Sequence, residues 1–197
     1  MKHQVIVIHG GSSFKTHKAS FLFLKKLKLD FNRYLNAINS WKKTLDVTLG
    51  KKFDVIRPDM PNSMDAKYSE WKIWFEKFIP YFQPEIVLVG HSLGGIFLAK
   101  YLSETKFPRK VRATFLVAPP FNADNFTLPK SLERLEAQGG KIFLYFSKDD
   151  AQVKFFNFGK YQKKLKNVTA RIFKEKGHFN VPRLPELVKD IKNLYSY

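Results

Sequence analysis

The sequence contains no cysteine in 197 residues, and this absence excludes several kinds of protein at once. A disulfide framework, a thiolate metal site and a cysteine nucleophile are all ruled out. Histidine is scarce, with five residues, and neither the histidines nor the carboxylates follow the spacing of a metal-binding motif. We therefore expect neither a metal nor another cofactor.

Long hydrophobic runs are also missing. No stretch approaches the roughly 18 consecutive apolar residues that would indicate a membrane span. The apolar run after Lys2 is too short for a signal peptide, and it leads directly into Gly10 and Gly11. A hydrophobic content of 44% with 20 phenylalanines is nevertheless enough for one well-buried core. The sequence predicts a single domain over residues 1–197 and a cytoplasmic location.

Acidic residues are few: 17 Asp and Glu oppose 35 Lys and Arg, which gives a net charge of +18. The excess lies at the two ends, with +9 over residues 1–52 and +7 over residues 147–197. Such a charge attracts nucleic acid or anionic membranes. Lysines far outnumber arginines, however, whereas the planar arginine fork is better suited to phosphate recognition. A solvated basic surface is the favoured interpretation, nucleic acid or anionic lipid binding is the alternative, and the oligomeric state is open.

Short β-branched segments alternate with helical ones along most of the chain. Several segments end at glycine or proline, which stop a strand or a helix. The six predicted strands are residues 4–11, 53–61, 85–90, 112–120, 141–147 and 168–174. Helices are predicted over residues 70–79, 93–104, 129–140, 156–165 and 184–197. This alternation predicts the α/β class, with a mostly parallel, doubly wound sheet covered by helices on both faces.

One segment departs from that alternation. Residues 14–45 contain no predicted strand, and from Ala19 to Leu45 apolar side chains recur at spacings of three and four. These side chains are Leu24, Leu27, Phe31, Tyr34, Ile38, Trp41 and Leu45. We expect a basic insertion of two or three short helices, with Asp30 at the start of one. Packing on the sheet edge or over the site is favoured over a partner surface, and a lid over the site stays open.

The sharpest motif is "GHSLG", residues 90–94, between an apolar strand and an amphipathic helix. In a strand, turn and helix of this kind the serine, Ser92, adopts a strained backbone conformation that pushes its hydroxyl clear of the sheet. Gly90 and Gly94 are needed because side chains there would collide with the strand and the helix. The backbone N–H of Leu93, at the helix start, is a natural donor to a developing oxyanion. The motif indicates nucleophilic catalysis by Ser92.

A serine nucleophile needs a base, an orienting carboxylate and a second oxyanion donor. His178 follows the last predicted strand and is the predicted base. Asp149 and Asp150 follow the fifth strand, and the acid of such sites is commonly followed, after two residues, by an aliphatic one. Asp150 fits that pattern and Asp149 does not, so Asp150 is favoured. The glycine turn after the first strand offers the N–H of Gly11 or of Ser12 as the second donor.

The chain resembles the small α/β-hydrolases of the retinoblastoma-binding-protein-nine and YdeN type, a group of minimal serine hydrolases. The matching stretches are "IHGG", "SWKKTL…FDVIRPDMPN", "EWKIWFEKF", "GHSLGG", "KIFLYFSKDD" and "KGHF", which cover the first strand and most of the chain from Ser40 onward. The resemblance implies a minimal α/β-hydrolase fold with little or no cap, and roles for Ser92, Asp150 and His178 that agree with those above. Residues 14–39 look like an insertion relative to the shortest members.

These residues predict acyl transfer to water, in which a carboxylic ester or an amide is cleaved through an acyl-enzyme. The abundance of phenylalanine and tryptophan predicts an apolar acyl pocket and therefore a small apolar acyl substrate. Two other functions stay open at this stage. One is a catalytically silent binding protein that keeps the fold, and the other is a binder of nucleic acid or anionic lipid through the basic ends.

Overall fold

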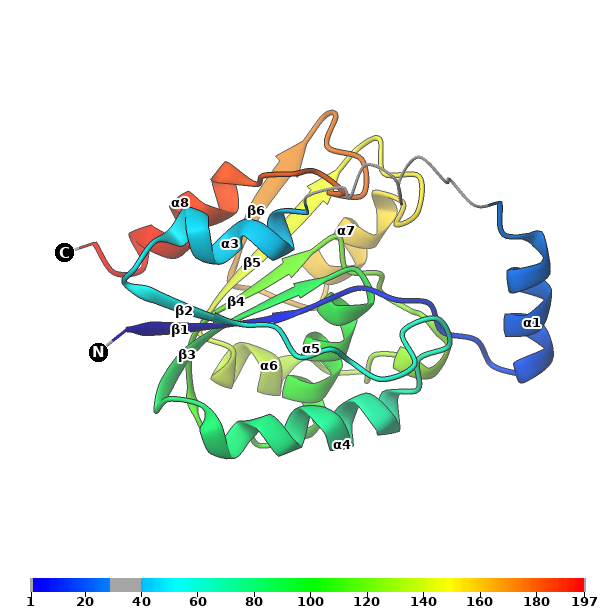
Figure 1. The fold of residues 1–197 in the computed structure, drawn as a ribbon, viewed down its shortest axis with the longest axis horizontal. Coiled ribbons are helices and arrows are strands. Elements are labelled where there is room, and N and C mark those ends of the chain that lie inside the picture. Colours follow the sequence, from blue (N-terminus) through cyan, green and yellow to red (C-terminus); the bar gives the residue numbers. More distant parts are fainter. Residues whose placement is uncertain (1, 29–39, 197) are drawn as a thin grey trace.

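The computed structural model describes residues 2–28 and 40–196, which are built around one parallel sheet (Figure 1). Within these residues the sheet has six strands in the order β2-β1-β3-β4-β5-β6, and every neighbouring pair is parallel. The strands are β1 (His3–Ile8), β2 (Phe53–Ile56), β3 (Glu85–His91), β4 (Lys110–Val117), β5 (Lys141–Ser147) and β6 (Val168–Phe173). The predicted α/β class and the doubly wound sheet are confirmed.

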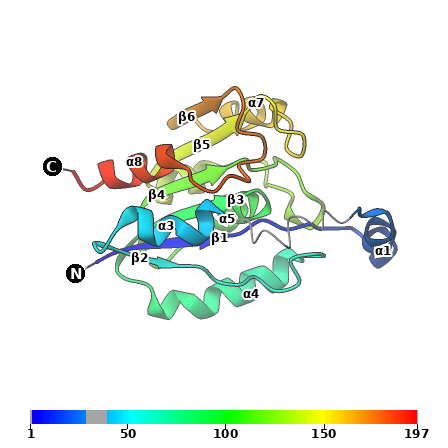
Figure 2. The same cartoon turned by 45° about the horizontal axis from the view of Figure 1, so that its top comes forward.

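Helices cover both faces of the sheet (Figure 2). The described α-helices are α1 (His17–Lys26), α3 (Trp41–Leu49), α4 (Tyr68–Phe78), α5 (Leu93–Glu104), α6 (Glu133–Gln138), α7 (Phe156–Gln162) and α8 (Pro185–Asn193). Two 3-10 turns, η1 (Ile79–Tyr81) and η2 (Asp124–Phe126), follow α4 and β4. Side chains of α3 and α8 form one core with the sheet, and side chains of α4, α5, α6 and α7 form the other. No helix in the described part of the chain is long and apolar enough to cross a membrane.

The central strands, β1 and β3, are buried on both faces, as their continuous apolar sequences predict. Every residue of β1 after His3, and every residue of β3 after Glu85, is buried, because one face contacts α3 and α8 and the other contacts α4 and α5. At the sheet edge β2 is shorter than predicted. It ends at Ile56, where its pairing with Ile6 of β1 stops, and Pro58, which has no backbone N–H to donate, follows two residues later.

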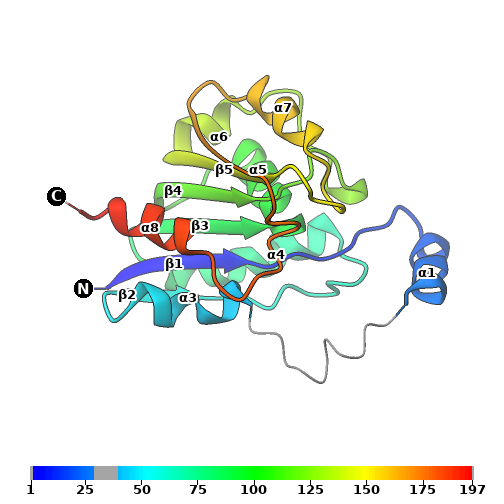
Figure 3. The ribbon, with the colours of Figure 1, turned by 90° about the horizontal axis from the view of Figure 1, so that it is seen from above.

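The predicted insertion divides into parts with different surroundings. Helix α1 lies beyond the carboxyl ends of the strands, away from the sheet (Figure 3). Leu24 and Leu27 are 51% and 42% exposed, so these two side chains do not pack on the sheet edge, and coverage of the site by the insertion stays a prediction. Trp41 and Leu45, each 1% exposed, do pack in the core from α3. The remaining apolar residues of the predicted stripe and the predicted helix start lie outside the described residues: Phe31, Tyr34, Ile38 and Asp30.

An ionic cluster around the buried carboxylate of Asp190 ties α8 to the edge of the sheet. The carboxylate of Asp190 accepts hydrogen bonds from Arg171 Nε at 2.8 Å and Arg171 Nη2 at 2.7 Å, and a further one from the Tyr145 hydroxyl. Burial by itself would raise the pKa of Asp190, but the hydrogen bonds from Arg171 and Tyr145 outweigh it and hold that pKa below its ordinary value. The charged form of Asp190 is therefore part of the folded state.

We expect Asp190→Asn to lower the free energy of unfolding at neutral pH by about 2 kcal/mol, the usual scale for hydrogen bonds to a charged group. Because the pKa of Asp190 is lowered by folding, this contribution is complete above the ordinary aspartate pKa and is lost as the pH falls through the lowered value. Urea denaturation of both proteins at neutral pH and at about pH 3 measures the difference. The exposed Asp59 supplies the control, Asp59→Asn, and equal unfolding free energies for wild type and Asp190→Asn at neutral pH would contradict the prediction.

Candidate active site

The carboxyl ends of the parallel strands bring the predicted site residues to one edge of the sheet. Ser92 follows β3, Asp150 follows β5, His178 follows β6, and the glycine turn with Gly10 and Gly11 follows β1. A pocket of ≈290 Å³ lies at this edge. It is lined by His9, Gly10, Gly11, Ser12, Lys42, His91, Ser92, Gln152, His178 and Asn180.

Ser92 has the strained backbone that the motif predicts. Its φ of 54° and ψ of −119° lie in a region that side chains rarely adopt. A Cβ on Gly90 would lie 2.4 Å from the carbonyl oxygen of Gly94, and a Cβ on Gly94 would lie 2.3 Å from that of Ile8. The N–H of Ser92 donates to the carbonyl of Val117 at 2.8 Å. Close backbone approaches at the two glycines, Gly90 and Gly94, and one hydrogen bond to β4 thus hold the turn.

Asp150 and His178 form a directed pair. The buried Asp150 places Oδ2 2.8 Å from His178 Nδ1. Its other oxygen, Oδ1, accepts the backbone N–H groups of Gln152 at 2.8 Å and Val153 at 2.9 Å. The carboxylate is therefore held from two sides, and it accepts the Nδ1–H of His178. This leaves Nε2 of His178 as the unprotonated nitrogen of the neutral ring.

Asp149, the competing aspartate, does not touch the imidazole. Its carboxylate accepts the hydroxyl of Ser147 and the backbone N–H of Gly177, the latter at 2.9 Å. The hydrogen bond from Ser147 is the main reason that the pKa of Asp149 lies below its ordinary value. Ser147 Oγ in turn accepts the N–H of Lys176 at 2.8 Å. The geometry thus pairs Asp150 with the imidazole, whereas Asp149 binds the loop that precedes His178.

The two predicted donors in the glycine turn differ in availability. The N–H of Ser12 donates to the carbonyl of Ser63 at 2.8 Å, so the expectation that Ser12 offers a free donor is wrong. The same residue accepts the N–H of Ala66 at 2.8 Å, which ties this part of the turn to the neighbouring loop. Gly11 lies next to Leu93, since a Cβ on Gly11 would be 3.3 Å from Leu93 Cδ2. Leu93 begins α5, where first-turn N–H groups have no partner within the helix.

Gly10 and His9 support the pocket in ways that the sequence motifs do not reveal. A Cβ on Gly10 would lie 3.1 Å from Ser92 Cβ, so this glycine keeps space beside the serine. His9 Nδ1–H donates to the carbonyl of Gly10 at 2.6 Å, and His9 Nε2 accepts the N–H of Met60 at 2.8 Å. Both ring nitrogens of His9 are therefore engaged in holding loops, and His9 does not compete with His178 as a base.

Two further residues of the pocket, His91 and Lys42, were not among the predicted site residues. His91 Nε2–H donates to the carbonyl of His178 at 2.8 Å, and Nδ1 lies 3.3 Å from Lys42 Nζ. Burial, with Lys42 as the second cause, lowers the pKa of His91 well below its ordinary value. His91 could have been suspected from its place beside the serine. Lys42 carries no sequence signal, because it is one of many lysines in a strongly basic chain.

The prediction of an apolar acyl pocket is wrong, because the pocket beside Ser92 has a polar lining. Each of the ten described lining residues is a glycine or carries a polar side chain. The large aromatic side chains instead fill the core, as Trp71, Phe75 and Phe97 do between α4 and α5. Aromatic abundance therefore reports on core packing in this chain and not on the pocket.

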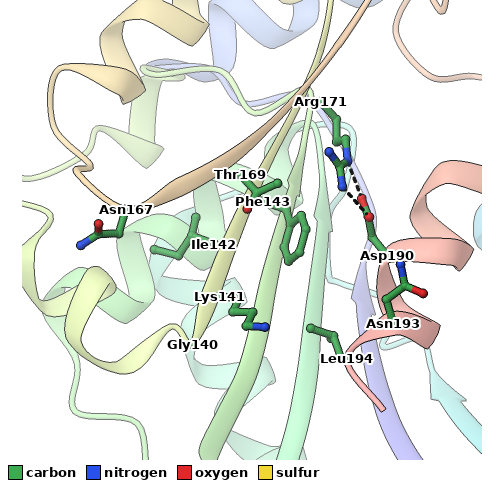
Figure 4. A pocket seen from close by; sticks show the side chains of 10 residues that line it. All are labelled: Gly140, Lys141, Ile142, Phe143, Asn167, Thr169, Arg171, Asp190, Asn193 and Leu194. Atoms are coloured by element: carbon green, nitrogen blue, oxygen red, sulfur yellow. Dashed lines mark hydrogen bonds and ion pairs between the residues drawn. The ribbon is translucent and has the colours of Figure 1, made fainter. Parts of the chain in front are cut away.

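A second hollow, of ≈540 Å³, lies at the opposite end of β5, near Gly140 and Lys141 (Figure 4). Its buried carboxylate, Asp190, already binds Arg171. Ligands of open α/β sheets bind at the carboxyl ends of the strands, whereas this hollow lies where β5 begins. The pocket beside Ser92 is therefore the candidate site. Among the described residues, no three His, Cys, Asp or Glu side chains are grouped to hold a metal ion.

Solved structures share this arrangement of strands and helices. The ydeN gene product of Bacillus subtilis is 18% identical over 100% of both chains, with a TM-score of 0.71. Naproxen esterase (carboxylesterase NP) from Bacillus subtilis is 11% identical, over 99% of this chain and 84% of that chain, with a TM-score of 0.64. Est1E from Butyrivibrio proteoclasticus is 15% identical, over 98% of this chain and 87% of that chain, with a TM-score of 0.60. At these identities the similarity shows the fold alone, which is that of the minimal α/β-hydrolases.

A comparison of the sequence with family models shows the family to which the chain belongs. The model of the serine hydrolase family matches residues 36–183, a segment that holds Ser92, Asp150 and His178. No curated protein sequence matches the chain. Because the family match covers most of the chain and agrees with both the fold and the elbow at Ser92, the protein belongs to the serine hydrolase family.

Proposed function

We propose that this protein is a carboxylesterase-like serine hydrolase that cleaves a small ester through Ser92, His178 and Asp150. The observation that carries the proposal is the 2.8 Å hydrogen bond from His178 to the buried Asp150, at the pocket that Ser92 also lines. Family membership supports hydrolysis, and the similar structures named as esterases support an ester substrate. An amide is the alternative substrate of the same chemistry.

The first half of the proposed reaction forms an acyl-enzyme. His178 Nε2 takes the proton of the Ser92 hydroxyl while Oγ bonds to the ester carbonyl carbon. The carbonyl oxygen becomes an oxyanion, which accepts hydrogen bonds from the N–H groups of Leu93 and Gly11. The bond to the alcohol oxygen then breaks, and His178 returns the proton to the leaving alcohol. Asp150 stabilises the imidazolium that exists between these two proton transfers.

The second half releases the acid. His178 accepts a proton from a water molecule whose oxygen bonds to the acyl carbon, and a second oxyanion forms on the same two N–H groups. Collapse of this intermediate breaks the bond to Ser92 Oγ, which regains its proton from His178. One ester and one water thus become one carboxylic acid and one alcohol, and the enzyme returns to its starting state.

Reaction with a fluorophosphonate probe tests the nucleophile directly. We expect the folded wild type to be labelled on the peptide that contains Ser92 and to hydrolyse 4-nitrophenyl acetate. Ser92→Ala should lose labelling and lower kcat/KM by at least about 10⁴-fold, because the covalent step is removed. Mass spectrometry of the modified peptide and release of 4-nitrophenolate are the measurements.

Ser12→Ala is the matched control, because it removes another serine hydroxyl from the same pocket. The N–H of Ser12 is bound to Ser63, so Ser12 has no part in the proposed reaction. The variant should still be labelled. A folded wild type that is neither labelled nor active would sink the proposed function and favour a silent binding protein.

The two adjacent aspartates allow a second test. We expect Asp150→Asn to lower kcat by about 10³- to 10⁴-fold, because an amide opposite Nδ1 favours the wrong tautomer of His178. Asp149→Asn should cost less than about tenfold, since an amide oxygen still accepts the hydrogen bonds from Ser147 and Gly177. Steady-state kinetics of both variants with 4-nitrophenyl acetate gives the comparison. A larger loss in Asp149→Asn than in Asp150→Asn would assign the acid to Asp149.

A further inference from the structure

Helix α1 carries a patch of large apolar side chains that the fold leaves exposed to solvent. Four such side chains are between 42% and 51% exposed: Phe21, Leu22, Leu24 and Leu27. The other large apolar side chains exposed in the described part of the chain are spread over several elements, as Val47 on α3 and Ile73 on α4 are. An apolar cluster on the surface of a folded protein commonly marks a site where a partner or a membrane binds.

The start of α1 is fixed to the rest of the protein. The carbonyl of Phe14 accepts hydrogen bonds from Lys67 Nζ at 2.9 Å and from Asn125 Nδ2 at 3.0 Å. The hydroxyl of Thr16, at the N-cap of α1, accepts the N–H of Ala19 at 3.2 Å. The helix therefore begins at a defined place beside these loops.

Only one side of α1 packs on the protein. Ser20 is buried, and the ring of Phe23 contacts that of Phe14, with centroids 5.1 Å apart. Ser20 and Phe23 are three residues apart and so lie on the same side of the helix. Phe21 and Leu24 each follow one residue later, which turns them by about 100° around the helix axis. This second side of α1 is the exposed one.

The segment around α1 has charge of one sign. Residues 15–28 contain no Asp or Glu and five exposed lysines: Lys15, Lys18, Lys25, Lys26 and Lys28. Within the part of the chain that the structure describes, none of the five forms an ion pair with a carboxylate. The ammonium of Lys25 lies 4.6 Å from the centroid of the Phe21 ring, so charged and apolar groups are interleaved on the exposed side.

This mixture selects among the possible occupants. A second copy of the chain would bring the same positive charge to the contact and would be repelled. A nucleic acid would pair with the lysines but leave Leu24 in water, and α1 contains no arginine for phosphate recognition. The interface of an anionic bilayer accepts both kinds of group, because apolar side chains enter the acyl boundary while lysine stems reach back to the headgroups.

We propose that α1 docks the protein on the surface of an anionic phospholipid bilayer. Phe21 and Leu24 enter the acyl boundary, and the lysines of residues 15–28 contact the headgroups. A helix of ten residues is about 15 Å long, so α1 lies in the interface. Because α1 lies beyond the carboxyl ends of the strands (Figure 3), docking brings the edge of the sheet that carries Ser92 toward the bilayer. The proposal does not depend on the chemistry of Ser92.

Co-sedimentation with sucrose-loaded vesicles tests the docking. One set of vesicles is phosphatidylcholine alone, and the other replaces about a third of it with phosphatidylserine. At about 100 mM KCl we expect a partition coefficient at least about tenfold larger for the anionic vesicles, because each lysine near the surface adds attraction. The absence of wild-type protein from the anionic vesicle pellet would overturn the proposal.

Paired substitutions separate the apolar contribution from the charge. Phe21→Ser with Leu24→Ser keeps every charge and should lower the partition coefficient by about tenfold or more, because the inserted apolar area is lost. Val47→Ser with Ile73→Ser is the matched control and should bind as wild type, since it removes two exposed apolar side chains from other helices. Thermal melts establish that both variants are folded. Unchanged binding by the α1 variant would contradict the proposal.

A second pair of variants tests whether the lysines act locally. Lys25→Gln with Lys26→Gln should lower the partition coefficient by about tenfold or more. Lys51→Gln with Lys52→Gln removes the same charge from exposed positions just before β2, at the other end of the sheet, and should cost less than about threefold. Equal losses in the two variants would assign binding to the net charge of the chain and overturn docking through α1.

The absence of cysteine allows a direct measurement of insertion. Leu24→Cys can be labelled at one position with the environment-sensitive dye NBD, and Ile73→Cys provides the control on α4. Anionic vesicles should shift the emission of the dye at position 24 to shorter wavelength and raise its intensity, with no change at position 73. Binding of a single-stranded RNA by wild type, with no response of the dye at position 24 to vesicles, would assign the lysines to nucleic acid and overturn the proposal.

Discussion

The site depends on a place where three backbone segments meet without side chains between them. The end of β1, the end of β3 and the start of α5 approach so closely that a Cβ on Gly94 would lie 2.3 Å from the carbonyl oxygen of Ile8. This contact forces the chain to turn at once from strand to helix, and Ser92 takes the positive φ at the corner. Such a conformation costs on the order of 1–3 kcal/mol and persists only where surrounding contacts enforce it. The result is a hydroxyl that faces the pocket, with a helix start beside it.

The insertion contributes to the site through its last helix. Trp41 is buried against the loop after β6 and donates two hydrogen bonds to it, from its indole and its backbone. The same loop carries His178, so α3 and the proposed base are parts of one packed unit. This places Lys42 at the pocket wall, although it lies far from the strands that carry the other site residues. Helix α1, by contrast, keeps Leu24 and Leu27 exposed beyond the end of the sheet.

The amino-acid composition does not show that the apolar side chains lie in the core and the polar ones line the pocket. The aromatic residues pack between the sheet and its helices, where Trp71 and Phe97 contact each other edge to face. The pocket beside Ser92 is left with glycines, amides, imidazoles and one ammonium group among its described lining residues. A chain rich in phenylalanine thus builds a polar site, because its aromatic surface is used for the core.

The sequence by itself determined the class of the fold, the six strands, and the serine at the strand-to-helix turn with its candidate partners. It could do so because apolar periodicity and the glycines around Ser92 act locally, and because parallel strands send the loops that follow them to a common edge. The spacing to Val153 already favoured Asp150 over Asp149, and the tertiary structure places Asp150 against the imidazole of His178 and Asp149 against Gly177. Only the tertiary structure decided that the N–H of Ser12 is occupied by Ser63, and that Lys42, among many lysines, reaches the pocket. The outcomes for Ser12 and Lys42 depend on contacts between residues far apart in the chain, and no local pattern of sequence encodes them.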